Sequence, residues 1–114
     1  MSKADQILAS FLASAHTEQQ QLFAKLEFCF EYQDFLKEEC TAIVEEVYAI
    51  AKAKNYKVEL SLSLVCKSYF AAQNKQYAQT KAFMDEALVL AIEAGSSLAH
   101  SFVLQYSSFL FWAQ

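Results

Sequence analysis

The chain matches itself when its sequence is shifted by 40 residues, and the match needs no gap. Segment 45–51 (EEVYAIA) falls on segment 85–91 (DEALVLA), Asn55 falls on Gly95, and Leu62 meets an apolar residue both 40 positions before and 40 positions after it. A fixed period of this size is typical of solenoids, in which each helical hairpin buries its apolar face against its neighbours. The period therefore predicts an all-α fold of stacked antiparallel hairpins and favours binding over catalysis.

Composition agrees with a helical domain. The chain has one glycine and no proline in 114 residues, so residues that break helices are scarce. Its length is that of one domain, which we expect to span 1–114. Hydrophobic residues make up 55% and charged residues only 19%, below the rough quarter found in soluble domains. This excess of apolar residues suggests that another chain buries part of the surface.

Apolar spacing and capping signals place the helices. Thr17 and Gln20 form a capping-box pattern, and Gly95 suits the left-handed residue that follows a helix. The apolar spacing from 22 to 50 would suit one long helix, but the repeat aligns Asp34 with a turn at Asn74, so we expect a break there. The predicted helices are 4–15, 18–33, 35–54, 57–73, 76–94 and 97–113.

Segment 58–64 alternates apolar and polar residues, as a half-buried strand would. No second strand is present for it to pair with, and the aligned segment 98–104 does not alternate cleanly, so we predict a helix. Its expected core stripe is Val58, Leu62, Val65, Tyr69 and Ala72, with a weaker stripe at Leu60 and Leu64. Two apolar faces are typical of a helix that lies between neighbours.

Charge and cysteine content restrict the partners and the location. All basic residues are lysines and the formal net charge is −4, so direct nucleic-acid binding is not expected. No apolar run is long enough to cross a membrane, and we expect a cytoplasmic protein. Cys29, Cys40 and Cys66 lack CxxC spacing and lie in apolar stretches, which predicts buried free thiols in a reducing compartment.

Hairpin 62–95 resembles a tetratricopeptide repeat. Ser68 stands at a small-residue position, the turn Asn74-Lys75-Gln76 precedes the aromatic Tyr77, and Met84, Ala87 and Leu88 follow in the second helix. The resemblance implies a short solenoid of paired helices. The chain differs from that family in having Thr80 at a usual alanine, no closing proline, and a longer period than about 34 residues.

Segments 31–47 and 84–87 are also similar to helices of the 14-3-3 phosphopeptide-binding proteins. That family binds phosphate with an Arg-Arg-Lys-Tyr cluster, and the corresponding helix would fall near Lys67-Ser68-Tyr69-Phe70. Arginine is absent from the chain. The likeness therefore implies stacked helices without the phosphate chemistry.

The chain shows no pattern of catalytic or metal-binding residues. His16 and His100 have no cysteine or carboxylate at helical spacing, and no nucleophile elbow or phosphate loop occurs. The carboxylate pairs Glu38-Glu39 and Glu45-Glu46 diverge by about 100 degrees on a helix, as solvated faces do. We therefore expect no enzyme activity, no cofactor and no metal.

A stack of hairpins would line its concave wall with the first helix of each pair. Steps of 40 residues place Val65 beside Lys25 and Gln105, and Cys29 in register with Tyr69, although many of these side chains would equally pack between hairpins. The predicted partner-binding residues are Lys25, Tyr32, Gln33, Tyr69, Gln73, Gln105 and Trp112. Their mixture of aromatics and amides favours a protein or peptide partner.

The final helix is apolar on every side and ends without a polar cap, so we expect its last face to be covered by another chain or by a continuation of this one. A homodimer is the simplest assembly. The predicted interface residues are Ile7, Leu8, Phe11, Phe109, Phe111 and Trp112.

Two functions of different classes follow from these patterns. The first is a noncatalytic helical-repeat module that binds a protein or peptide. The second is a regulatory sensor fragment that binds a small molecule or signalling peptide and acts on a domain outside this chain.

Overall fold

The computed structural model of the chain describes residues 2–112, except for the side chains of Phe109, Phe111 and Trp112. Within this range the chain forms helices and no strand, which confirms the all-α prediction, including a helix at 58–64. The helices are α1 (Lys3–Leu12), α2 (Glu18–Tyr32), α3 (Lys37–Lys54), α4 (Lys57–Gln73), α5 (Tyr77–Ala94) and α6 (Ser97–Trp112).

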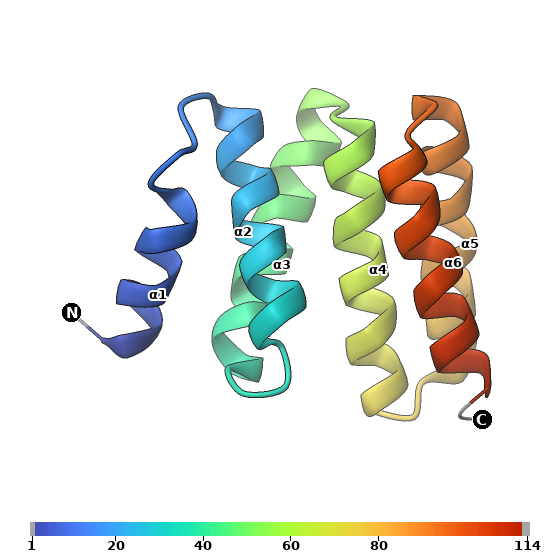
Figure 1. Cartoon of the computed structure of the whole chain (residues 1–114). Helices are drawn as coiled ribbons and strands as arrows, with labels where there is room; N and C mark the ends of the chain where they lie inside the picture. The colour runs from blue at the N-terminus through green and yellow to red at the C-terminus, as the bar shows by residue number, and fades with distance from the viewer. Residues whose placement is uncertain (1, 113–114) are drawn as a thin grey trace.

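Successive helices run antiparallel and form two layers (Figure 1). Helices α2, α4 and α6 lie side by side in the near layer, and α3 and α5 lie behind them. Helix α1 packs against α2 at one end of the assembly. Helix α4 contacts α2, α3, α5 and α6 and is therefore the central element.

Burial on all sides explains why the sequence of α4 misleads. Every residue from 59 to 66 is buried, so the alternation of apolar and polar residues does not mark one wet face. The buried hydroxyls are satisfied by backbone carbonyls: Ser61 Oγ donates to Ala87 O at 2.7 Å, and Ser68 Oγ donates to Thr80 O at 2.8 Å. Small hydroxyl side chains thus join α4 closely to α5.

The predicted core stripe of α4 needs correction. Leu62 and Val65 are buried as expected, but Val58, Tyr69 and Ala72 are only half-buried. Leu60 and Leu64, assigned to the weaker stripe, are 7% and 0% exposed. Helices on both sides of α4 are the physical reason, because they cover the weaker stripe as fully as the stronger one.

The 40-residue period recurs in the coordinates. Helices α3 and α5 both have 18 residues and begin 40 positions apart. The order of buried, half-buried and exposed residues over 40–55 is the same as that over 80–95. Asn55 and Gly95 follow these helices in the left-handed conformation, with φ of 57° and 63°. Equivalent residues thus have equivalent environments in these two helices.

The predicted helix starts and the predicted break are also present. The Thr17–Gln20 capping box forms, with the Thr17 hydroxyl accepting from the Gln20 backbone N–H at 3.1 Å. Ser2, rather than Asp5, caps α1. Helix α2 ends at Tyr32 and α3 begins at Lys37, so the helix breaks at the expected place despite the continuous apolar spacing. Capping groups satisfy N–H groups that lack a partner within the helix.

Candidate binding groove

Three adjoining hollows follow the line where α2 and α6 flank α4. Their volumes are about 540, 400 and 340 Å³, and we number them first, second and third in that order. Neighbouring hollows share lining residues, so together they form one open depression, which we call the α2–α6 groove. The shared residues are Phe11, Phe23 and Glu27 for the first two hollows, and Phe30, Gln105 and Tyr106 for the second and third.

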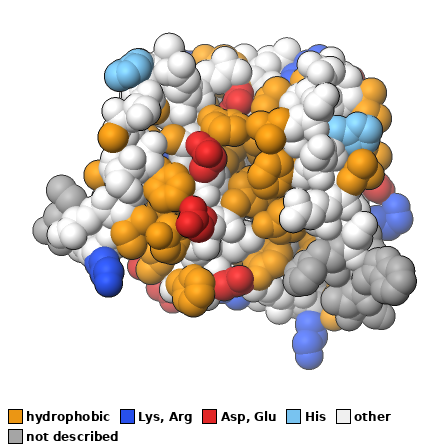
Figure 2. Space-filling model, in the orientation of Figure 1, with side chains coloured by type: hydrophobic (Ala, Val, Ile, Leu, Met, Phe, Trp, Pro, Cys, Tyr) orange, Lys and Arg blue, Asp and Glu red, His pale blue; other side chains and the backbone are white. Residues whose placement is uncertain are grey.

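Aromatic side chains from α2 and α6 meet across α4 in this groove. The Phe30 ring centroid lies 4.6 Å from that of Phe102 and 5.4 Å from that of Tyr106. Phe102 and Tyr106 stack on each other along α6, with ring centroids 6.4 Å apart. Figure 2 shows the resulting apolar stripe on the face formed by α2, α4 and α6. A surface of this kind offers several rings to a bound chain.

The charged residues that line the groove are all acidic. They are Glu27, Glu31, Asp34 and Glu59. Of the described residues lining the three hollows, none is a lysine or a histidine. In Figure 2 acidic side chains lie among the apolar ones, whereas the lysines in view lie at the edge of the face. The groove therefore combines apolar surface with negative charge.

Lysines pair with carboxylates of the other layer instead. Lys25 Nζ lies 2.5 Å from Glu46 Oε1 on α3. Lys67 Nζ lies 2.9 Å from Glu45 Oε1 and 4.2 Å from the ring centroid of Tyr48. Within residues 2–112, no lysine lies within 4.0 Å of a groove carboxylate. The acidic groups of the groove thus keep their charge unpaired.

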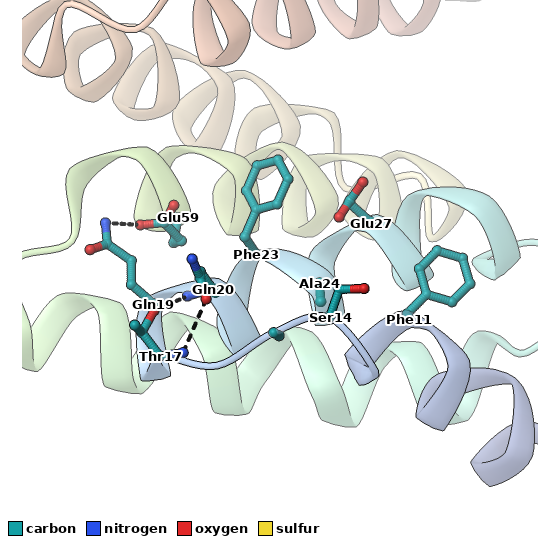
Figure 3. A pocket seen from close by; sticks show the side chains of 10 residues that line it. Phe11, Ser14, Thr17, Gln19, Gln20, Phe23, Ala24, Glu27 and Glu59 are labelled. Atoms are coloured by element: carbon teal, nitrogen blue, oxygen red, sulfur yellow. Dashed lines mark hydrogen bonds between the residues drawn. The ribbon is translucent and has the colours of Figure 1, made fainter.

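The first hollow contains a buried carboxylate (Figure 3). Glu59 is 4% exposed and accepts a hydrogen bond from Gln19 Nε2 at 2.6 Å. It lies in the first turn of α4, where the helix dipole favours negative charge. The Gln19 bond and the helix terminus together stabilise the carboxylate in this position.

The third hollow contains a buried amide. Gln33 is 4% exposed, and its Nε2 donates to the Tyr106 hydroxyl at 3.1 Å. Its Oε1 has no hydrogen-bond partner among the described residues. Asp34 borders the same hollow and accepts a hydrogen bond from the Tyr69 hydroxyl.

Both tyrosines of the third hollow resist ionisation. Burial raises the pKa of Tyr69 to about 12, and its hydrogen bond to the Asp34 carboxylate acts in the same direction. Burial also raises the pKa of Tyr106, against the opposite effect of its bond with Gln33. The two rings therefore remain neutral hydroxyl-bearing aromatics at physiological pH.

Three of the predicted partner-binding residues meet in this hollow. Gln33, Tyr69 and Gln105 all line it. The other predictions lie elsewhere: Lys25 pairs with α3, Tyr32 packs on the ring of Phe28 at 5.3 Å, and Gln73 lines none of the three hollows. Trp112 has no described side chain.

The expected concave wall was wrong at Cys29 and Val65, which are both fully buried between helices. The three cysteines are free and buried, as predicted. A hydrogen bond with Cys40 and burial raise the pKa of the Cys29 thiol, and burial raises that of Cys66. The Cys40 pKa is lowered by the same bond with Cys29.

Sequence reasoning missed most of the groove residues on α2. Phe23, Glu27, Phe30, Glu31 and Asp34 follow one another at steps of three and four, with one single step, and so share one side of the helix. This spacing was readable from the sequence. It was overlooked because the 40-residue register started from Lys25, which lies on the opposite side of α2.

The predicted oligomer residues of α1 have contacts within the chain. Ile7, Leu8 and Phe11 are half-buried against the core. The Phe11 ring packs edge-on against Phe28, with centroids 5.8 Å apart. Phe109, Phe111 and Trp112 lie outside the described side chains, so the predicted interface stays a prediction.

In the described part of the chain, no helix combines the length and apolar character needed to span a membrane, and no group of three or more His, Cys, Asp or Glu side chains is placed to hold a metal ion. The chain matches no family model, no curated protein and no solved structure.

Proposed function

We propose that this chain is a noncatalytic helical module that binds a peptide or protein segment in the α2–α6 groove. The observation that supports this best is the groove itself, in which Phe23, Phe30, Phe102 and Tyr106 line adjoining open hollows along two helices. Amphipathic helices and extended peptides bind such surfaces by placing apolar anchors in successive hollows. An enclosed small-molecule pocket would instead surround most of its ligand.

The dimensions of the groove suit a short segment. Helix α2 has 15 residues, which corresponds to a length of about 22 Å at about 1.5 Å per residue. A helical partner of about 15 residues, or an extended one of about seven, would cover that length. A peptide of this size can contact all three hollows.

The proposal includes the finer points that the sequence suggested. Recurrence of helix bounds and burial at 40 residues favours a tetratricopeptide-like stack, and buried free thiols favour a reducing, cytoplasmic location. A small-molecule sensor is the second candidate, because the third hollow, at about 340 Å³, has the volume of a ligand pocket.

A random library of peptides about 15 residues long, displayed on phage and selected on the purified protein, tests the proposal. Enriched peptides are then synthesised and their affinities measured by fluorescence anisotropy. Phe23→Ala removes a half-buried ring that lines two hollows, and Phe83→Ala is the matched control, since Phe83 is half-buried on α5 away from the groove.

We expect Phe23→Ala to weaken binding by about tenfold or more, as loss of an aromatic anchor does, while Phe83→Ala leaves it unchanged. Melting temperatures of both variants check that the fold is intact. Selection without enrichment, or equal affinity for both variants, would refute a peptide-binding groove.

A further inference from the structure

We propose that the third hollow is a subsite for a cationic side chain, and that the peptide partner presents a lysine or arginine there. This inference rests on the proposed function for the peptide, but the subsite itself binds a cation whether or not a peptide carries it. Gln33, Asp34, Tyr69 and Tyr106 form it, with Phe30 at its border.

Charge complementarity is the first argument. Carboxylates are the only charged groups among the described residues that line the groove, and none of them is within 4.0 Å of a described lysine. A cationic partner would be attracted by this field, whereas an acidic or phosphorylated one would be repelled. The charge of the partner is thus restricted to one sign.

The buried amide of Gln33 is the second, independent argument. Its Nε2 is held by the Tyr106 hydroxyl, whereas its Oε1 lacks a partner among residues 2–112. A buried acceptor without a partner is costly, so a ligand that donates an N–H to this oxygen gains by satisfying it. Ammonium and guanidinium groups donate N–H and accept nothing, which matches this requirement.

The aromatic walls are the third argument. Phe30, Tyr69 and Tyr106 border the hollow, and a cation over such rings is attracted by their negative faces. The raised pKa values of Tyr69 and Tyr106 keep both hydroxyls neutral at physiological pH. A cation in the hollow would therefore contact rings, one carboxylate and one amide oxygen.

The first hollow lacks this combination. Its buried carboxylate, Glu59, already accepts the hydrogen bond from Gln19. In the third hollow, by contrast, the acceptor is free and the neighbouring carboxylate is exposed at Asp34. The third hollow is thus the best site for a donor group.

N-acetyl-arginine methylamide, titrated into ¹⁵N-labelled protein, tests the subsite without any peptide. We expect saturable chemical-shift changes at the Gln33 side-chain amide and at the backbone amides of Asp34 and Tyr106. The citrulline analogue has the same shape and no charge, and it should give no saturable change. The lysine analogue should bind at the same place, and its trimethylated form, which keeps the charge but loses N–H donation, should bind more weakly.

Variants separate local contact from overall charge. Asp34→Asn should weaken arginine binding about three- to fivefold, the size of an exposed ion pair. Gln33→Leu, which keeps the volume and removes the acceptor, should weaken it about tenfold. Glu86→Gln on α5 is the matched control for charge and should change nothing, since Glu86 is exposed and lines none of the three hollows.

Equal binding of arginine and citrulline, or equal losses in Asp34→Asn and Glu86→Gln, would overturn the subsite. Asp34 is exposed, so its variant folds even if Gln33→Leu does not. Selected peptides that bind the groove without any basic residue would overturn the subsite but leave the proposed function standing. Arginine binding without peptide enrichment would support the subsite and refute the proposed function.

Discussion

Leu64 and Leu104 occupy equivalent positions 40 residues apart, yet Leu64 is 0% exposed and Leu104 is 55% exposed. Helix α4 has a hairpin on each side, whereas α6 has only α4 and α5 as described neighbours. The burial of Leu64 thus comes from the stacking of successive hairpins. An equivalent neighbour is lacking at Leu104 within residues 2–112.

The first prediction compares these two leucines. Leu64→Ala should lower the free energy of unfolding by about 2–5 kcal/mol, because it removes buried methyl groups and leaves a cavity. Leu104→Ala should change that free energy by about 0.5 kcal/mol or less, as exposed substitutions usually do. Urea denaturation of both variants measures the two values. Similar losses at both positions would show that stacking does not explain the burial of Leu64.

The second prediction concerns the left-handed residue after α5. Gly95 has a φ of +63°, and a Cβ added there would meet no heavy atom within 4 Å, so Gly95→Ala introduces backbone strain without a clash. We expect it to lower the free energy of unfolding by about 1–2 kcal/mol. Asn55→Gly, at the equivalent position after α3, should be neutral or slightly stabilising. Urea denaturation checks both, and a neutral Gly95→Ala would contradict the prediction.

The third prediction concerns pH. The pKa of Tyr69 is raised to about 12 in the folded protein, above the ordinary value of about 10. Its neutral form therefore stabilises the fold fully below about pH 10, and this contribution is lost as the pH rises through about 12.

Tyrosinate absorbance at about pH 11 tests this sign. Unfolding the wild-type protein in urea should increase the absorbance, because Tyr69 ionises only after its burial and its bond to Asp34 are lost. In Tyr69→Phe the increase on unfolding should be smaller. An unchanged increase in Tyr69→Phe would mean that Tyr69 ionises normally in the folded state.

The fold could be predicted from the sequence because its signals are local or periodic. The Thr17–Gln20 capping box, the left-handed Asn55 and Gly95, and the 40-residue period fixed the number of helices and their bounds. These features depend on backbone chemistry that each short segment carries by itself.

The groove was only partly predictable, because it depends on how helices rotate when they pack. Tyr69, Gln33 and Gln105 were expected in one site and meet there. Lys25 was misplaced, since the period gives equivalent positions but not which side of α2 faces the groove. The free oxygen of Gln33 depends on its contact with Tyr106, 73 positions away, and no sequence pattern announces such a pair.

The fourth prediction concerns oligomerisation. Val89, Ile92, Leu98 and Leu104 leave large apolar side chains exposed on α5 and α6, which is typical of surfaces that a partner covers. We expect a homodimer in light scattering, as the sequence analysis predicts. Leu104→Glu should shift it to monomer without lowering the melting temperature of the monomer. A monomer at high concentration in the wild-type protein would contradict the prediction.

The most direct test of the central claim, that the α2–α6 groove binds a peptide segment, is chemical-shift mapping of a selected peptide on the ¹⁵N-labelled protein. The account predicts that the largest shifts lie in α2 and α6, around Phe30 and Gln105, with smaller ones in α4. Shifts confined to the outer surfaces of α3 and α5 would contradict it.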